Sequence, residues 1–293
     1  MEKLLQWSIA NTQGDAQAKE RAGNPDPNAL AQLLGNVVDD VTLMRENLKN
    51  ASNPELSLEN REISLDNFEM LIENLDNANN IQNLKLWDPL LNLLNAKEPS
   101  IRSLVCSIIG TAVQNNPKSQ KNFTSYDNSI KKLIQISLDK SEQTSVKIKA
   151  LYALSNSCRN FEKGYELFEA ENGWLIVSDL IFETGKNNLL NYKLQLRFLS
   201  LLSSLLSTAF NKKKENFIQN EKVIQILTKL ATQNIEKISF IDNSLNIIGQ
   251  LISHNYNFND QEKSHIITLL ENLDNVKNEL SKEDYKLVQS LTV

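Results

Sequence analysis

The chain has 293 residues, a net charge of −5, only 8 glycines and 6 prolines, and 6% aromatic residues. This length allows one large domain, and the shortage of turn-forming and aromatic residues argues against a sheet-rich fold. Acidic and basic residues are interspersed, which excludes the basic stripe that nucleic-acid binding requires, so no nucleic-acid partner is expected. The one basic run, residues 212–214, is interpreted as a solvated loop.

Residues 1–38 are predicted to be a flexible N-terminal arm. They begin with MEKLLQWSIAN, whose apolar part is too short and too interrupted for a secretory signal. The polar stretch that follows is broken by glycine and proline, which disfavours a packed structure. No window of the chain reaches the roughly 18 apolar residues that a membrane span needs. We therefore expect no membrane association and a cytoplasmic location.

Residues 39–293 are predicted to be an armadillo-like helical repeat domain. IGTAVQNNPKSQKNF at 109–123 aligns with LSNSCRNFEKGYELF at 154–168 at a shift of 45 positions (154 minus 109). Further copies lie at 68–79, 199–210 and 245–256. A helical unit of about 40–47 residues is typical of armadillo and HEAT repeats. Such a unit cannot bury its apolar face alone, so the expected fold is an all-α, right-handed superhelical solenoid.

The sequence shows no catalytic or metal-binding motif. There is no Walker loop, no GxGxxG, no HExxH and no Cys/His cluster with metal-ligand spacing. Cys106 and Cys158 are expected to be buried reduced thiols, and His254 and His265 lie far from Cys158 along the chain. The acidic pair at 39–40 is interpreted as solvated charge in a linker. We expect a protein that is not an enzyme and that uses neither a metal nor a cofactor.

The stretch YALSNSCRN at 152–160 resembles the last helix of an armadillo repeat in nuclear-import receptors. In those proteins an aromatic residue and an Asn four positions later hold an extended basic peptide, and the pair recurs in successive repeats. Here the pair Tyr152–Asn156 occurs once. The positions in phase with it are polar in every repeat: Glu69, Ser107, Ser200 and Asn246 for Tyr152, and Glu73, Thr111, Ser204 and Gln250 for Asn156. A polar concave surface without an aromatic ladder favours a folded partner, the alternative being an ordinary solvated face.

Several stretches resemble one known family more specifically. MEKLLQWSIAN, RAGNPDP and DNFEMLIENLDNANNIQNLKLW (66–87) are similar to the fungal armadillo-type nucleotide exchange factors of the cytosolic 70-kDa heat-shock chaperone, the Fes/HspBP-like family. IIGTAVQNN and YALSNSCRN are similar to its central repeats. The resemblance implies a monomeric co-chaperone that binds the ATPase domain of the chaperone, accelerates ADP release and thereby promotes substrate release. Such a protein acts by binding the open, nucleotide-poor chaperone more tightly than the closed form.

We expect the partner-binding residues in two regions. The first is the end of a concave helix, which is acidic and rich in amides: Glu73, Asp76, Asn77 and Ala78. Ala78 is small enough for close approach, although an alanine at a helix end is usually only packing. The second is Arg197, the sole charge in an apolar run, which suits a bidentate carboxylate contact, its alternative being a surface arginine that covers apolar neighbours. The remaining candidates are Tyr152, Asn156 and Arg159.

The resemblance also implies a role for the N-terminal arm. Family members carry an N-terminal release segment that mimics chaperone substrate and contacts the substrate-binding domain. The corresponding apolar residues here are Leu4, Leu5, Trp7 and Ile9. An amphipathic helix that caps the first repeat is the alternative for this segment. For the whole chain, the alternative function is an armadillo adaptor or scaffold that binds another protein or a cargo peptide without exchange activity.

Overall fold

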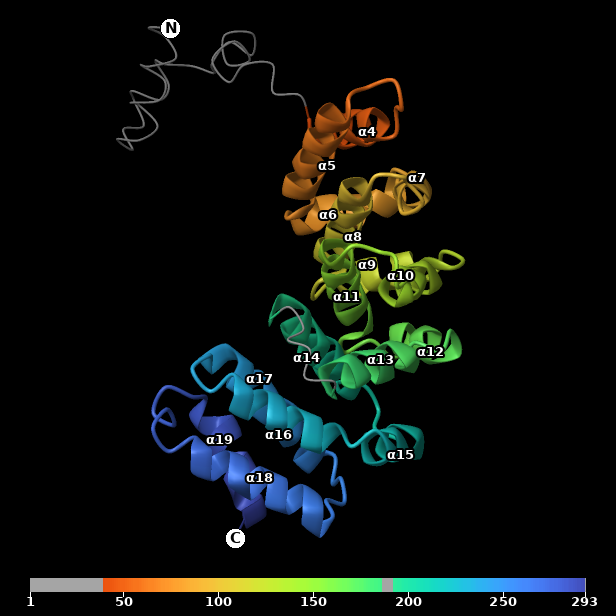
Figure 1. Ribbon diagram of the computed structural model, residues 1–293. Coiled ribbons are helices and arrows are strands. Elements are labelled where there is room, and N and C mark those ends of the chain that lie inside the picture. The colour runs from red at the N-terminus through yellow and green to blue at the C-terminus, as the bar shows by residue number, and fades with distance from the viewer. Residues whose placement is uncertain (1–38, 186–191, 293) are drawn as a thin grey trace, which may run out of the picture. The chain divides into compact units, whose positions relative to one another are not determined.

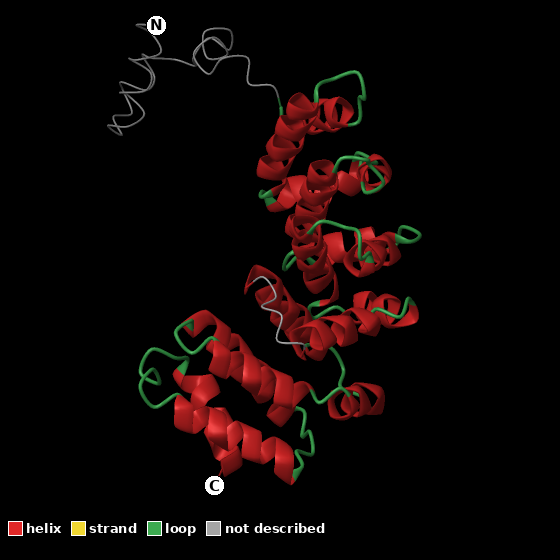
Figure 2. Cartoon of the chain, in the orientation of Figure 1, coloured by secondary structure: helices red, strands yellow, loops and turns green. Residues whose placement is uncertain are grey.

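The computed structural model describes residues 39–185 and 192–292 of the chain, with side chains left out for 182–185 and 292. In these ranges the regular elements are α-helices and one short 3₁₀ helix, and no strand occurs (Figures 1 and 2). The prediction of an all-α fold is confirmed. The predicted arm, residues 1–38, lies outside the described residues.

The helices follow one another at short intervals. Their bounds are α4 (Asp40–Ala51), α5 (Leu58–Ile72), α6 (Leu75–Asn83), α7 (Trp87–Leu93), α8 (Pro99–Val113), α9 (Pro117–Thr124), α10 (Ser129–Leu138), α11 (Thr144–Cys158), α12 (Glu162–Ala170), α13 (Trp174–Gly185), α14 (Tyr192–Leu206), α15 (Lys212–Asn220), α16 (Val223–Gln233), α17 (Ile238–Ser253), α18 (Asp260–Asn272), α19 (Lys282–Gln289) and the 3₁₀ helix η1 (Ser290–Thr292).

The chain divides into two compact units, Met1–Leu43 and Met44–Val293. Of the first unit, the structure describes only residues 39–43. There the carboxylate of Asp39 accepts hydrogen bonds from the backbone N–H of Thr42 at 2.9 Å and from its hydroxyl at 2.8 Å. These bonds lower the pKa of Asp39. The acidic pair at 39–40 therefore stands at the start of a helix and not in a linker, although both side chains are exposed. The predicted domain boundary at residue 38 stays a prediction.

The second unit is a stack of helical repeats. Its five longest helices, α5, α8, α11, α14 and α17, each pack on the next in that order. Their first residues are 58, 99, 144, 192 and 238, so successive repeats are 41, 45, 48 and 46 residues long. Figure 1 shows the five long helices along one side of the stack and α7, α10, α12 and α15 along the other. The predicted repeat near 45 residues is confirmed.

The core runs between these two rows of helices. It is built mainly from Leu and Ile at helical spacing, with large aromatic side chains such as Trp87, Phe123 and Phe168 fully enclosed. Trp87 packs on Phe123 with ring centroids 5.4 Å apart. Cys106 and Cys158 are buried free thiols whose pKa is raised by burial, as the sequence predicts. Burial of this apolar surface is the main force that holds neighbouring repeats together.

Asparagine defines many of the helix ends. The side chains of Asn74, Asn116, Asn211 and Asn259 cap the helices that follow them by accepting bonds from backbone N–H groups. Five of the seven described non-glycine residues with positive φ are asparagines: Asn115, Asn128, Asn160, Asn172 and Asn255. Asparagine tolerates the left-handed conformation better than other side chains except glycine. The frequent asparagines therefore replace glycine at many of the turns.

The run at 212–214 is not a solvated loop, as the sequence suggested, but the first turn of α15. Lys214 is fully buried, and its ammonium donates to the carbonyls of Leu205 and Ala209 at 2.8 Å each and to the hydroxyl of Thr208 at 2.7 Å. The ammonium also lies 3.8 Å from the ring centroid of Tyr165. The C-terminal end of α14 has carbonyl groups without helical partners, and the lysine supplies donors to them. Burial lowers the pKa of Lys214 to about 8.

Candidate partner-binding surface

Polar side chains link the long helices to one another along one side of the repeat stack. We call this surface the ladder face and define it by the interacting polar residues of α5, α8, α11, α14 and α17. At its N-terminal end the carboxylate of Glu69 accepts bonds from the hydroxyls of Ser107 at 2.6 Å and Thr111 at 2.9 Å. Lys149 then donates to Ser107 at 3.0 Å. One continuous network thus joins α5, α8 and α11.

The middle of the ladder face is organised around Tyr152. Its hydroxyl donates to the side-chain oxygen of Gln114 at 2.8 Å, and its ring lies below the guanidinium of Arg197, with Cζ 4.8 Å from the ring centroid. The ring passes very close to Gly110, where an added Cβ would lie 2.4 Å from two ring carbons. Only a glycine in α8 therefore allows the ring of Tyr152 to take this position.

Asn156 and Arg159 make mainly structural contacts. Asn156 is buried, and its side-chain amide donates to the carbonyl of Gly110 at 3.2 Å. Gln120 donates to the carbonyls of Asn156 at 2.7 Å and Arg159 at 3.0 Å. The guanidinium of Arg159 reaches the carbonyl of Ser200 at 3.4 Å, and burial lowers its pKa. Of the predicted Tyr152–Asn156 pair, only the tyrosine is partly open to solvent.

The C-terminal part of the ladder face contains two residues of the predicted columns, Asn246 and Gln250, whose partners in other helices lie outside the columns. Gln250 donates to the hydroxyl of Ser203 at 2.8 Å and to the side chain of Asn246 at 2.9 Å. Asn246 in turn donates to the carboxylate of Asp284 at 3.3 Å. The column residues of α14, Ser200 and Ser204, instead donate to carbonyls of their own helix, so the predicted columns do not meet between α14 and α17.

The predicted cluster at the start of α6 splits into two parts. Glu73 and Asp76 are exposed, whereas Asn77 and Ala78 are buried. The side chain of Asn77 donates to the carbonyl of Leu71 at 3.0 Å, and Ala78 is part of the core. The packing alternative for Ala78 thus has direct structural support, and its contact with a partner stays a prediction. The predicted release segment, Leu4, Leu5, Trp7 and Ile9, lies outside the described residues.

Sequence reasoning missed Gly110 and Gln114, and also Ser203, which accepts the bond from Gln250. Gly110 could have been noticed as a glycine inside an otherwise apolar helix, which usually has a packing reason. Gln114 gives no such signal, because a polar residue at a helix end is common. Its bond to Tyr152 becomes visible only when α8 and α11 are placed side by side.

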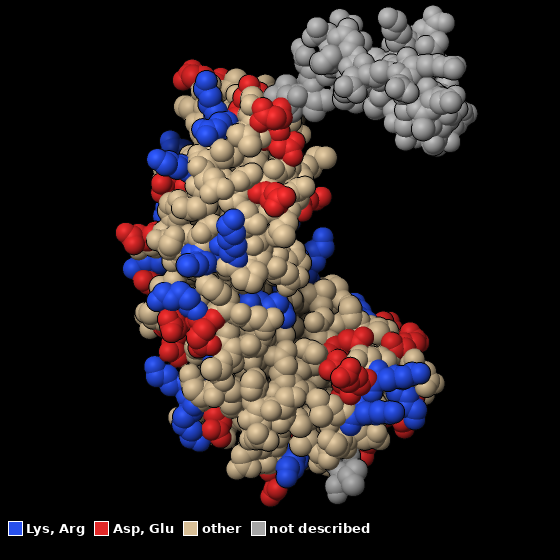
Figure 3. Space-filling view, turned by 180° about the vertical axis from the view of Figure 1, so that it is seen from behind, with Lys and Arg blue, Asp and Glu red and all other residues tan. Residues whose placement is uncertain are grey.

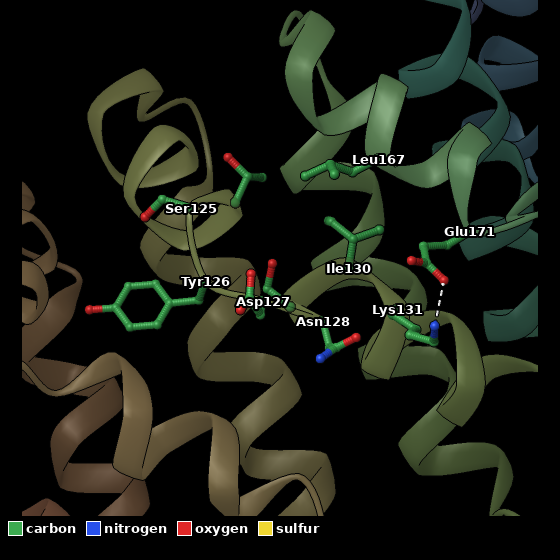
Figure 4. A pocket seen from close by; sticks show the side chains of 10 residues that line it. Ser125, Tyr126, Asp127, Asn128, Ile130, Lys131, Leu167 and Glu171 are labelled. Carbon is green, nitrogen blue, oxygen red and sulfur yellow. Dashed lines mark ion pairs between the residues drawn. The ribbon is translucent and has the colours of Figure 1, made fainter.

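A pocket away from the ladder face offers no comparable chemistry. It has a volume of about 320 Å³ and is lined by residues 124–131, Leu167 and Glu171. Figure 4 shows that Lys131, the only positively charged residue lining the pocket, forms an ion pair with Glu171. Its Nζ lies 3.1 Å from Oε2 of Glu171. In the described parts of the chain, no group of three or more His, Cys, Asp or Glu side chains could hold a metal ion. The helices described are also too short or too polar to cross a membrane.

Comparisons with known proteins agree with this architecture. An engineered protein covers 87% of the chain with a TM-score of 0.66 at 13% identity, and the match spans 95% of that protein. A designed armadillo repeat protein, solved in complex with the peptide (KR)4, covers 85% with a TM-score of 0.65 at 11% identity, over 98% of its own length. At such low identity these matches establish the fold alone, which is an all-α solenoid of armadillo type.

Sequence comparisons identify the family. The family model "Nucleotide exchange factor Fes1" matches residues 1–81, and the "SIL1/FES1/HPBP1 C-terminal domain" matches residues 77–292. Proteins named Hsp70 nucleotide exchange factor FES1 are 43% identical in Debaryomyces hansenii, over 292 residues, and 44% identical in Saccharomyces cerevisiae, over 294 residues. Each match covers 99% of both chains. The chain therefore belongs to the Fes1 family of nucleotide exchange factors.

Proposed function

We propose that this protein is a co-chaperone that accelerates nucleotide exchange on a cytosolic 70-kDa heat-shock chaperone (Hsp70). The observation that carries the proposal is the similarity to proteins named as Hsp70 nucleotide exchange factors, at 43–44% identity over 99% of each chain. The armadillo-type stack supplies a scaffold on which a folded domain can be held across several repeats.

The ladder face is the surface that we assign to the ATPase domain of the chaperone. Hydrogen bonds between its helices fix the side chains before any partner arrives, so little conformational entropy is lost on binding. Arg197 has no described carboxylate within ion-pair distance and can offer its donors to an acidic group of the partner. Glu73 and Asp76 are exposed and would meet basic groups.

The mechanism needs no catalytic residue. If the ladder face fits the open ATPase domain better than the closed, ADP-bound one, binding shifts the chaperone toward the open form and ADP leaves. By linkage, bound ADP must weaken the complex by the same factor by which the complex weakens ADP binding. The protein would therefore act through the difference between its affinities for the open and the closed ATPase domain. The residues that contact the chaperone set this difference, and no chemical step is involved.

Three further parts belong to the same proposal. We assign residues 1–38 as an arm that releases substrate by presenting Leu4, Leu5, Trp7 and Ile9 to the substrate-binding domain, as the family resemblance implies. The protein would act as a monomer, since one ladder face engages one ATPase domain. It would act in the cytoplasm, where the proposed chaperone is found.

Affinity measurements with the two nucleotide states test the proposal. Isothermal titration calorimetry would compare the full-length protein binding to the nucleotide-free and the ADP-loaded ATPase domain. We expect the nucleotide-free form to bind at least tenfold more tightly, or about 1.4 kcal/mol. Equal affinities would contradict the exchange role, because a ligand that binds both states equally shifts nothing. They would favour the adaptor alternative.

A further inference from the structure

Helix α5 carries an unusual concentration of exposed apolar side chains. Among the described residues, six large apolar side chains are exposed, and four of them lie in α5 and at the start of α6: Leu58, Ile63, Met70 and Leu75. Met70 is 69% exposed and Ile63 is 49% exposed. Seven positions separate these two, so they lie two turns apart on the same side of α5. Exposed apolar groups gathered in this way mark a surface that another molecule covers.

An acidic row runs along α5 beside these two residues. It is formed by side chains that recur every three or four positions: Glu59, Glu62, Asp66, Glu69 and Glu73. This spacing places them on one side of the helix, next to the side that carries Ile63 and Met70. Partial burial, together with the negative charges of Glu69 and Glu62, raises the pKa of Asp66. Figure 3 shows acidic side chains gathered at the α5 end of the repeat stack.

The acidic row forms no direct ion pair within the described part of the chain, although the positive charge of Lys149 in α11 acts on Asp66. None of its five carboxylates lies within ion-pair distance of a described Lys, Arg or His. Glu69 accepts hydrogen bonds from two hydroxyls and thereby joins the row to the ladder face. Like charges on one helix repel, and exposed apolar groups are costly in water. Both costs fall when a surface that is apolar at its centre and basic at its edge covers α5.

We propose that α5 is a second docking element and that it binds a patch on the chaperone's ATPase domain where Lys or Arg side chains surround an apolar centre. This inference rests on the proposed function and adds an orientation to it. Arg197 in α14 would pair with an acidic group on the partner, whereas the acidic row on α5 would pair with basic groups. The partner can therefore satisfy both α5 and the Arg197 region of the ladder face in only one direction, which excludes the reversed complex.

Two paired substitutions separate the apolar contribution from the electrostatic one. The first is Ile63→Ser with Met70→Ser, and its control is Leu175→Ser with Ile267→Ser, which alters the two exposed apolar residues outside α5 and α6. The second is Glu62→Gln with Asp66→Asn, and its control is Glu236→Gln with Glu279→Gln, two exposed acidic residues elsewhere. All four full-length variants would be titrated with the nucleotide-free ATPase domain at low and high salt, and their thermal unfolding and oligomeric state recorded.

The two variants should differ in their response to salt. Loss of Ile63 and Met70 should weaken binding about tenfold at both salt concentrations, since apolar contacts are not screened. Loss of the charges on Glu62 and Asp66 should weaken binding about fivefold at low salt and much less at high salt. Both controls should stay within about twofold of the unaltered protein.

Three outcomes would overturn the inference. If the unaltered protein binds but both α5 variants match their controls, α5 is not a docking element, and the proposed function stands. If loss of Ile63 and Met70 changes unfolding or oligomeric state but not affinity, the apolar side is covered by this chain or by a second copy. If the unaltered protein does not bind the ATPase domain at all, the proposed function fails and the inference fails with it.

Discussion

The guanidinium of Arg197 in α14 is stacked over the ring of Tyr152 in α11, with 4.8 Å between Cζ and the ring centroid. The stack restrains an otherwise flexible side chain and leaves the N–H donors at the edge of the guanidinium plane free to point away from the ring. A restrained guanidinium loses less entropy when it forms two parallel bonds to a carboxylate. Tyr152 therefore acts as a positioning residue for Arg197.

Reversing the charge of Arg197 should abolish most of the affinity for the ATPase domain while leaving the fold intact. We expect Arg197→Glu to weaken binding by at least about tenfold, because a carboxylate would face the acidic group of the partner. The free energy of unfolding should change by less than about 0.5 kcal/mol, since the side chain is partly exposed. Calorimetric titration and urea unfolding test this, with Lys118→Glu, an exposed lysine in α9, as the control.

Substitution of Gly110 should act on Arg197 through Tyr152. In Gly110→Ala the new Cβ would lie 2.4 Å from the ring of Tyr152, so the ring must move and the stack with Arg197 must break. We expect a loss of about 1–3 kcal/mol in stability from overpacking and a weaker complex with the chaperone. In the double variant Gly110→Ala, Tyr152→Ala the stability should recover in part, but the affinity should not. Independent, additive effects on stability would contradict this coupling.

The fold and the polar columns could be predicted from sequence because both depend on spacing alone. A shift of 45 residues aligns the long helices, and it correctly brings the in-phase residues Glu69 and Ser107 into contact. Spacing does not predict which of these side chains form hydrogen bonds inside the protein and which remain free to contact a partner. Asn156 was predicted to face a partner, yet it is buried and bound to the carbonyl of Gly110.

Lys214 illustrates the same limit. In the sequence it is the last residue of a basic run, and lysines are rarely buried, so a solvated loop was the natural prediction. Its burial follows from the end of α14, where carbonyls need donors: Lys214 donates to the carbonyls of Leu205 and Ala209, and the hydroxyl of Thr208 also donates to Leu205. Sequence patterns do not reveal such a need, because it arises when α15 folds back onto the end of α14.

The ion pair between Arg102 and Glu142 should contribute to stability in a pH-dependent way. Arg102 forms two parallel bonds to Glu142, at 2.7 and 2.8 Å, and these bonds lower the pKa of Glu142 below its ordinary value of 4.5. The ionised carboxylate of Glu142 therefore makes its full contribution to the free energy of unfolding above about pH 4.5. This contribution is lost as the pH falls through the folded-state pKa. We expect Glu142→Gln to cost about 1–3 kcal/mol at pH 7.

Urea unfolding of the unaltered protein and the Glu142→Gln variant at pH 7 and pH 3 would measure this contribution. The difference in unfolding free energy should be smaller at the lower pH, because the carboxyl group is then protonated in the unfolded chain and increasingly so in the folded one. A difference of the same size at both pH values would show that Glu142 stabilises the repeats through packing and not through its charge.

Lys214 should show a pH dependence of the same sign, but at alkaline pH. Burial lowers its folded-state pKa to about 8, whereas the ordinary value is 10.5, so the unfolded chain binds more protons between these two values. Stability should therefore rise with pH from about 8 to 10.5 when it is compared with a Lys214→Met variant, by roughly 1–3 kcal/mol. A pH-independent difference between the two proteins in thermal or urea unfolding would contradict the lowered pKa.

Release of a fluorescent ADP analogue from the chaperone, followed by stopped flow, tests the exchange role of the ladder face most directly. The full-length protein would be compared with its Arg197→Glu variant and with the Lys118→Glu control. We predict that the unaltered protein and the control accelerate release strongly and that Arg197→Glu loses most of this effect. Equal acceleration by all three proteins would show that Arg197 takes no part in exchange, and no acceleration by the unaltered protein would contradict the proposed function itself.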